Sequence, residues 1–224
     1  MIPFKDNIPS RTIPFITVLI IILNVLVFVF EISLGPRTLQ AFIYAFGVVP
    51  AQFLAEPYIV PFFTSMFLHG GWMHLIGNMW YLWIFGDNVE DKLGHFRFLL
   101  FYLLCGLGAG IVHMALNVNS VIPSVGASGA IAGVLGAYML SYPGARVLTL
   151  VPIFIFIQVI EIPALVVLFF WFVMQLFSGM ASLAVATTSS GGVAWWAHIG
   201  GFVIGMILLG VLGRKPRYGD YSRY

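Results

Sequence analysis

Long apolar runs constrain the fold of this chain more than any other feature. The first covers residues 13–30 and is interrupted only by Thr17 and Asn24. A helix rises about 1.5 Å per residue, so about 20 apolar residues cross the hydrocarbon core of a bilayer. Charged residues make up only 8% of the chain, against about 25% in soluble domains. The sequence therefore predicts an all-α polytopic membrane protein.

Six apolar runs are expected to span the bilayer. They cover residues 13–30, 72–85, 96–116, 128–142, 162–177 and 193–212. The long connection 31–60 is expected at the membrane interface, because it is too apolar for a solvated linker. Residues 147–160 are expected to form an interfacial or re-entrant segment, since prolines interrupt the apolar run there. The expected domains are a cytoplasmic tail 1–12, a membrane core 13–212 and a basic cytoplasmic tail 213–224.

The distribution of basic residues favours an even number of spans with both termini in the cytoplasm. Nine of the ten Lys and Arg residues fall in the two tails and in the loops 86–97 and 142–147, and Arg37 is the exception. Lys and Arg are enriched in cytoplasmic loops. The loop 117–127 is then external. Without a transit peptide, we expect a prokaryotic plasma membrane with the functional site opening outward.

Composition also excludes several classes of function. A net charge of +2 gives no reason to expect a nucleic-acid partner, and a lone cysteine, Cys105, excludes an intrachain disulfide. The five histidines have no cysteines at metal-ligand spacing. We therefore expect no metal, no cofactor and no nucleic acid. One of these histidines, His69, lies at a loop edge and is expected at the membrane interface.

Four polar side chains are expected at one depth, in the outer half of the membrane. Ser128 begins the fourth run, His198 lies near the start of the sixth, and His74 and Asn78 share one face of the second. Polar groups are costly in hydrocarbon and usually face a protein interior or a cavity. Taken singly, the serine also fits a helix cap, and the other three fit hydrogen bonds between helices.

Two pairs of glycines suggest how these groups meet. Gly129 and Gly133 lie four residues apart on the fourth run, and Gly201 and Gly205 repeat this spacing on the sixth. Small residues at this spacing let helix backbones approach closely. Ser128 adjoins the first pair, and the histidine of the sixth run precedes Gly201 on roughly the same face. Close packing of the two helices is expected to bring the serine and this histidine into contact.

Three motifs together resemble those of the rhomboid family of intramembrane serine proteases. They are His74-Leu-Ile-Gly-Asn78, Gly126-Ala127-Ser128-Gly129 and Ala197-His198-Ile199-Gly200-Gly201, in this order within residues 13–212. The resemblance implies a six-transmembrane-helix bundle whose long first loop, 31–60, is embedded in the membrane. It also implies that 162–177 and 178–192 act as a substrate gate and a cap.

The resemblance further implies a catalytic dyad. Ser128 would be the nucleophile, and His198 would be the general base and then the acid that protonates the leaving amine. Asn78, His74 and the backbone N–H of Ser128 would stabilise the oxyanion, with Gly126 in the same site. The implied substrates are transmembrane segments of other membrane proteins in the lipid bilayer.

The chain departs from the family in two places. Some members have an aromatic residue four positions after the nucleophile, where this chain has Ala132, and we expect Trp195 to supply a ring contact instead. Some members have a Trp-Arg pair in the first loop, but Arg37 has no adjacent tryptophan. No Asp or Glu is placed to orient the histidine, so a third member of a triad is not expected.

Two other functions compete with the protease. A non-catalytic rhomboid-like binder of transmembrane client proteins would be expected to lack the serine or the histidine, and both are present. A small transporter would need broken helices and charges at the membrane midplane, which are only faintly suggested by Pro152 and Pro163.

Overall fold

A computed structural model describes residues 2–153, 156–184 and 194–213. Most of the segment expected to act as a cap, and all but the first residue of the expected basic tail 213–224, lie outside the described residues. Six long helices form at the six positions expected from the apolar runs. They are α1 (Phe15–Ser33), α5 (Trp72–Leu93), α6 (His95–Leu116), α7 (Ser128–Ser141), α8 (Ala164–Ala184) and α9 (Trp195–Leu212).

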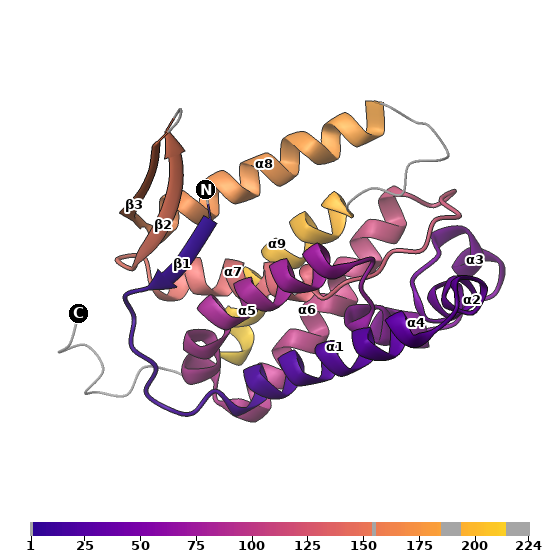
Figure 1. The fold of residues 1–224 in the computed structure, drawn as a ribbon, viewed down its shortest axis with the longest axis horizontal. Coiled ribbons are helices and arrows are strands. Elements are labelled where there is room, and N and C mark those ends of the chain that lie inside the picture. The colour runs from indigo at the N-terminus through magenta and orange to yellow at the C-terminus, as the bar shows by residue number, and fades with distance from the viewer. Residues whose placement is uncertain (1, 154–155, 185–193, 214–224) are drawn as a thin grey trace.

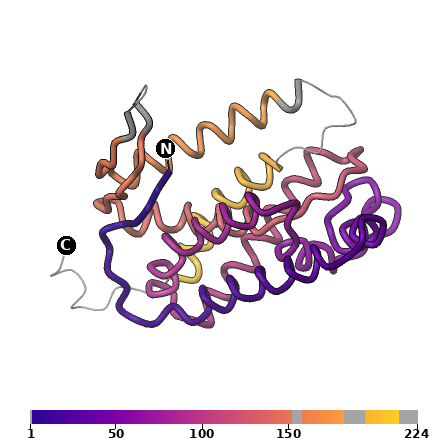
Figure 2. The backbone as a smooth tube through the Cα atoms, viewed as in Figure 1, coloured from indigo at the N-terminus to yellow at the C-terminus, as the bar shows by residue number. Residues whose placement is uncertain are grey.

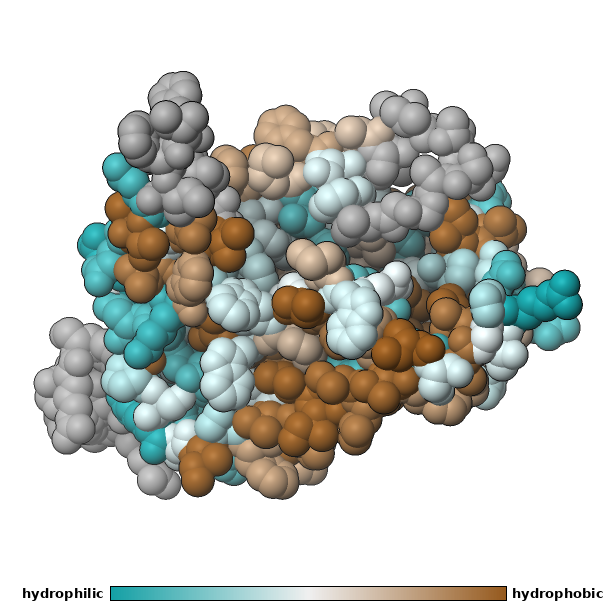
Figure 3. All heavy atoms as spheres, in the orientation of Figure 1, coloured by the Kyte–Doolittle hydropathy of each residue, from teal (hydrophilic) through white to brown (hydrophobic). Residues whose placement is uncertain are grey.

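Four of these helices are long and apolar enough to cross a membrane. They are α1, α6, the part Ala164–Ala181 of α8, and α9. The chain is therefore a mostly helical, multi-pass integral membrane protein, while the count of six spans stays a prediction. Figure 3 shows apolar side chains covering much of one face. Ile22 and Leu26 of α1 are exposed, as expected for a helix that faces lipid.

The other two long helices do not meet this criterion of length and apolar composition, for different reasons. Helix α7 has 14 residues, which gives it a length of about 21 Å, against about 30 Å for a hydrocarbon core. Its residues from Gly129 to Tyr138 are buried, because the other helices surround it (Figure 1). Helix α5 has 22 residues, but its last two turns contain Asp87, Glu90, Asp91 and Lys92.

The first connection folds into short helices at one end of the bundle, where Figure 2 shows the trace doubling back on itself. These are α2 (Pro36–Phe46), α3 (Pro50–Ala55), α4 (Val60–Thr64) and the 3-10 turn η1 (Ser65–Phe67). Backbone hydrogen bonds join this connection to the loop that precedes α7. Val48 and Ser124 exchange backbone hydrogen bonds of 3.0 and 2.8 Å, and the N–H of Gly126 donates to the carbonyl of Ser65 at 2.8 Å.

The expectation of an all-α fold is wrong in one respect, because three strands form an antiparallel sheet. They are β1 (Ile2–Asp6), β2 (Arg146–Ile153) and β3 (Phe156–Pro163), in the order β1-β2-β3. The hairpin β2–β3 occupies the expected interfacial or re-entrant segment. Its sequence is rich in β-branched residues, which favour strands, and Pro152 would interrupt a helix. Strand β1 lies in the expected tail and pairs with β2.

Two buried glutamates form hydrogen bonds that connect the ends of α1 to other parts of the chain. Glu90 of α5 accepts hydrogen bonds from the backbone N–H groups of Ile16 and Thr17, at 2.9 and 2.8 Å. These are among the N–H groups that the first turn of a helix leaves unpaired. Near the other end, Glu31 accepts from the N–H of His69 at 3.2 Å. Helix α1 therefore fixes the position of α5 and of the segment that leads into it.

Candidate active site

Ser128 is the first residue of α7 and follows a loop held in a constrained shape. Gly126 has φ of +125°, a conformation that L side chains rarely adopt and glycine adopts readily. Ala127 is the N-cap of α7, and no side chain caps this helix end. Ser128 therefore does not act as the helix cap that its position in the sequence also suggested. Its hydroxyl bonds to another helix instead.

His198 of α9 faces this serine directly. Its Nε2 lies 2.7 Å from the Oγ of Ser128, within the usual range for a hydrogen bond. The histidine is buried, with 8% of its surface exposed, while the serine is only partly buried. A serine hydroxyl hydrogen-bonded to an imidazole nitrogen is the arrangement needed for a general base to activate a nucleophile.

Glycines permit this contact because α7 and α9 pack backbone against backbone. A methyl group added at Gly201 would lie 2.0 Å from the carbonyl oxygen of Gly129, and one at Gly205 would lie 2.1 Å from that of Gly133. Neither position has room for a side chain. The structure thus brings together the four glycines of the two GxxxG pairs, beside the serine and the histidine.

A second polar face approaches the loop before Ser128 from α5. His74 Nδ1 accepts a 3.4 Å hydrogen bond from the N–H of Gly70, so Nε2 is the nitrogen that carries hydrogen. This Nε2 faces Gly126, where an added Cβ would lie 2.6 Å from it and 3.6 Å from Nδ2 of Asn78. His74, Asn78 and Gly126 therefore meet at the start of α7, where donors can face a developing oxyanion.

His69 is buried, with only 3% of its surface exposed, and its expected position at the membrane interface stays a prediction. Its Nε2 lies 3.0 Å from Nδ2 of Asn78, and an amide nitrogen can only donate. Its backbone N–H is held by Glu31, so the histidine stays beside the asparagine. Sequence reasoning missed this contact because His69 precedes α5 and belongs to no helix face that a period would reveal.

Comparison with known proteins shows the family of the chain. The family model described as the Rhomboid domain matches residues 56–215, more than half of the chain. The chain belongs to the rhomboid family.

Several curated relatives align with the chain over much of its length. It is 32% identical to Rhomboid-like protein 11, chloroplastic, of Arabidopsis thaliana, over 69% of this chain and 53% of that protein. It is 38% identical to RHOMBOID-like protein 2 of the same plant, over 70% of this chain and 43% of that protein. With the Rhomboid protease GluP of Bacillus subtilis it shares 36% identity, over 61% of this chain and 25% of the relative. The chain thus spans between a quarter and about half of these relatives.

Helix α8 of this rhomboid domain supplies two contacts to His198 that sequence reasoning missed. The Nδ1 of His198 lies 2.7 Å from Oε1 of Gln175, and the ring of Trp171 contacts the imidazole with 5.9 Å between centroids and an interplanar angle of 32°. The signal was present, since Gln175 is the strongly polar residue of the apolar run 162–177. Such residues in a membrane segment usually mark function.

Trp195 also contacts the histidine, as expected from the alanine at position 132. Its ring lies edge-on, with 6.1 Å between centroids and an interplanar angle of 86°. Trp171 is closer to parallel with the imidazole than Trp195 is. Two tryptophans, one from α8 and one from α9, therefore contact the ring.

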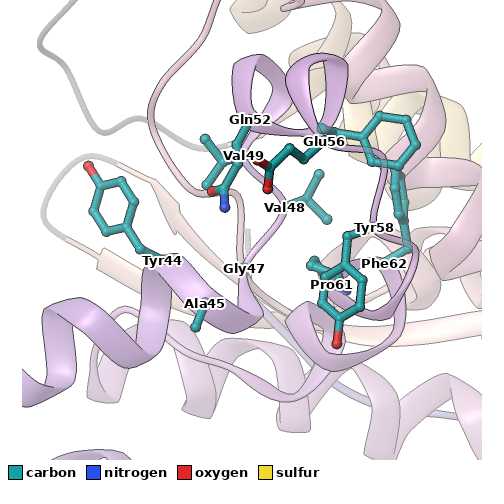
Figure 4. A pocket seen from close by; sticks show the side chains of 11 residues that line it. Tyr44, Ala45, Gly47, Val48, Val49, Gln52, Glu56, Tyr58, Pro61 and Phe62 are labelled. Carbon is teal, nitrogen blue, oxygen red and sulfur yellow. The ribbon is translucent and has the colours of Figure 1, made fainter.

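A pocket in the first connection is separate from this site. Figure 4 shows it among α2, α3 and α4, with Tyr44, Gln52, Glu56 and Tyr58 around it. None of its lining residues belongs to the Ser128–His198 pair or to the polar face of α5. The pocket has a carboxylate and an amide but no serine or histidine among its lining residues, so it offers no second nucleophile with a base.

Proposed function

We propose that this chain is an intramembrane serine endopeptidase that hydrolyses peptide bonds in or near transmembrane segments of other membrane proteins. The observation that carries the proposal is the 2.7 Å contact between Ser128 Oγ and His198 Nε2, inside a rhomboid domain. Family membership supports it further, because the relatives include a protein named as a rhomboid protease.

In the proposed mechanism, His198 accepts the hydroxyl proton of Ser128 as the oxygen attacks the scissile carbonyl carbon. The resulting imidazolium then gives this proton to the leaving amine, and an acyl-enzyme forms. Water, activated by the same imidazole, attacks the acyl carbon and releases the second product. The serine regains its proton, so the enzyme returns unchanged.

The oxyanion of the tetrahedral intermediate is proposed to bind where α5 meets the start of α7. The N–H of Ser128 belongs to the first turn of α7, where backbone donors lack helical partners. The positive end of the helix dipole also favours negative charge there. Asn78 and His74 supply side-chain donors beside Gly126, whose lack of a side chain leaves them access. Removing one such donor in a serine protease costs roughly 100- to 1,000-fold in kcat.

Substrates are proposed to be transmembrane proteins because the Ser–His pair lies among apolar helices. A peptide bond must become accessible to the serine, and water must reach the acyl-enzyme, so we propose a site that opens toward the outer side of the membrane. The proposed setting is a prokaryotic plasma membrane with both termini in the cytoplasm. The position of nine of the ten basic residues supports that orientation.

The competing function is a non-catalytic rhomboid-like protein that binds transmembrane clients. Such a protein needs neither a nucleophile nor a base, whereas here both are present and hydrogen-bonded. The pairing of Ser128 with His198 therefore favours catalysis.

One experiment tests the proposal. The purified protein, in liposomes, is incubated with a labelled single-span membrane protein, beside Ser128→Ala, His198→Ala and a control, Ser33→Ala, whose serine is exposed on α1. The parent and the control are expected to cleave, and the two site variants to show almost none of this activity. Equal cleavage by all four proteins would eliminate the Ser–His mechanism. Client binding without cleavage by the parent would favour the non-catalytic function.

A further inference from the structure

We propose that Gln175 is a positioning residue that holds His198 in the tautomer able to act as a base. The proposal rests on the proposed function, because it assigns to Gln175 the third position of a Ser128–His198–Gln175 relay. It replaces the sequence expectation that no third member orients the histidine. That expectation considered only acidic residues, and an amide fills the position here.

The hydrogen bonds of the histidine fix the direction of the relay. The Oε1 of Gln175 is a carbonyl oxygen and can only accept, so the Nδ1 of His198, 2.7 Å away, must donate. A neutral imidazole carries one hydrogen. Its Nε2 therefore presents a lone pair, and this nitrogen lies 2.7 Å from the Oγ of Ser128. The serine donates to the histidine, and the histidine donates to the glutamine.

Without an acceptor beside Nδ1, no hydrogen bond favours the tautomer that carries its hydrogen on Nδ1. In the other tautomer Nε2 carries the hydrogen and cannot take the proton of the serine. The partner of one ring nitrogen generally sets the state of the other. In Ser-His-Asp proteases, an exchange that favours the wrong tautomer lowers kcat about 10⁴-fold with the geometry kept. Orientation of the ring is therefore a large part of catalysis.

An amide oxygen accepts the hydrogen of Nδ1 here, as a carboxylate oxygen would. Gln175 and His198 are only 7% and 8% exposed, so each depends on the other for this hydrogen bond. The amide oxygen keeps the ring oriented without adding a charge. Burying the polar amide of Gln175 also costs free energy unless the amide has a hydrogen-bond partner. The histidine is that partner.

The relay places part of the catalytic base on a different helix from the histidine. Gln175 and Trp171 lie one turn apart on α8, so both reach the ring from the same face of that helix. Figures 1 and 2 show α8 at the edge of the bundle, alongside α9. It follows that the base is competent only while α8 lies against α9, and withdrawal of α8 would remove both contacts.

Two substitutions separate the hydrogen bond from packing. Gln175→Met keeps an unbranched side chain of similar length without the oxygen, and Gln175→Glu keeps an oxygen acceptor there. The control Met174→Leu alters the neighbouring, exposed residue of α8. Cleavage of a labelled transmembrane substrate gives kcat and KM, and thermal unfolding identifies which variants fold. We expect Gln175→Met to lose at least tenfold in kcat with KM changed less than about threefold.

Restoring the acceptor is expected to restore the rate. Gln175→Glu should recover kcat to within about threefold of the parent, and the control should stay within about twofold. A folded Gln175→Met variant with the kcat of the parent would overturn the proposal. A folded Gln175→Glu variant as slow as the methionine variant would overturn it too, because the acceptor would then not be what matters.

A spectroscopic readout keeps the test independent of activity. In protein labelled with ¹⁵N-histidine, the His198 signals are assigned by their loss in His198→Ala, and their shifts report the tautomer. We expect Nδ1 protonated and Nε2 bare in the parent. The hydrogen on Nε2 in the parent would overturn the proposal, whether or not the variants fold. If the parent cleaves no better than Ser128→Ala, the proposed function fails, while this readout still decides the role of Gln175.

Discussion

At the residue scale, two tryptophans contact the imidazole of His198 at different angles. The Trp171 ring, from α8, is tilted by 32° from the imidazole plane, and the Trp195 ring, from α9, lies edge-on at 86°. Aromatic pairs contribute about 0.5–1.5 kcal/mol beyond the area that they bury. The two rings contact the imidazole from different helices and therefore limit its motion. Both contacts act on the orientation that the hydrogen bonds to Ser128 and Gln175 require.

Replacing either tryptophan by alanine is expected to lower activity about two- to tenfold, the rate equivalent of one lost aromatic contact. Trp171→Ala should have the larger effect, because the Trp171 ring is closer to parallel with the imidazole than the Trp195 ring is. The control is Trp83→Ala, whose side chain is exposed on α5. Cleavage rates and melting temperatures are compared for all three variants. If Trp195→Ala changes neither quantity, its contact with the histidine has no role.

The contact between Ser128 and His198 was predictable because each is a polar side chain in an apolar run. The glycine spacing indicated which helices meet. Gln175 satisfied the same criterion, but its partner depends on how α8 rotates against α9, which no local pattern encodes. The contact of His69 with Asn78 was out of reach for another reason, since it depends on the path of an irregular segment.

At the element scale, the close contact of α7 with α9 depends on glycines, which have no side chain to keep the two backbones apart. We expect Gly201→Ala to destabilise the fold by about 1–3 kcal/mol, because its methyl would overlap a backbone oxygen of α7 that cannot rotate away. Relieving the overlap must part the helices, so the distance between Ser128 and His198 grows and cleavage should fall. Thermal unfolding and cleavage rate are the measurements.

The matched control for this substitution lies on the same helix. Gly210 has nothing within 4 Å of an added Cβ, and alanine favours a helix over glycine by about 1 kcal/mol. Gly210→Ala should therefore be neutral or slightly stabilising, with unchanged activity. Equal melting temperatures for the two variants would mean that α7 and α9 are not held at backbone contact.

The small sheet anchors the N-terminal strand on α7 through a buried acid. Asp6 of β1 is only 9% exposed, and its carboxylate accepts a 2.5 Å hydrogen bond from the hydroxyl of Tyr138. The pKa of Asp6 is raised to about 6, mainly because the carboxyl is buried; the tyrosine hydrogen bond lowers it in part, and the nearby Asp87 raises it. The folded protein thus holds this proton more tightly than the unfolded chain does.

A raised pKa of this kind makes stability depend on pH. The contribution of Asp6 to the free energy of unfolding is fully present below about pH 4, the pKa of the group in the unfolded chain. It is lost as the pH rises through about 6, the pKa in the folded protein. We expect Asp6→Asn, which stays neutral, to gain melting temperature relative to the parent between pH 5 and pH 7. Histidines titrate in both proteins, so their effect cancels in the difference. A difference that does not change with pH would show that Asp6 is not the group responsible.

The helices were predictable as elements and the sheet was not. The six apolar runs expected to be helices each coincide with a long helix. The hairpin β2–β3 was missed because a short apolar run cannot be distinguished from a helix by its period. Strand β1 was missed because its partner lies far along the sequence, so nothing near residues 2–6 indicates pairing.

At the scale of the whole molecule, all but one of the basic residues that the structure describes gather at one end. Three of them are fixed there by contacts: Arg11 through its N–H to Asp91, Arg97 to the carbonyl of Leu212, and Arg146 to Glu161. The first connection, with Arg37, lies at the other end, as Figure 1 shows for α2 and α3. The asymmetry agrees with the proposed orientation, in which the sheet end faces the cytoplasm.

Labelling at two positions tests this orientation and the number of spans together. Cys105 is fully buried, so the parent should react little with a membrane-impermeant maleimide, and Ser10→Cys and Asn119→Cys each add one exposed thiol. We expect the second variant to react in intact cells and the first only after permeabilisation. Three long helices, α1, α5 and α6, lie between the two positions along the chain. The two thiols lie on opposite sides of the membrane only if an odd number of these helices crosses it. Labels on the same side would mean that one of the three does not cross, and α5, whose last turns are charged, would be the helix in question.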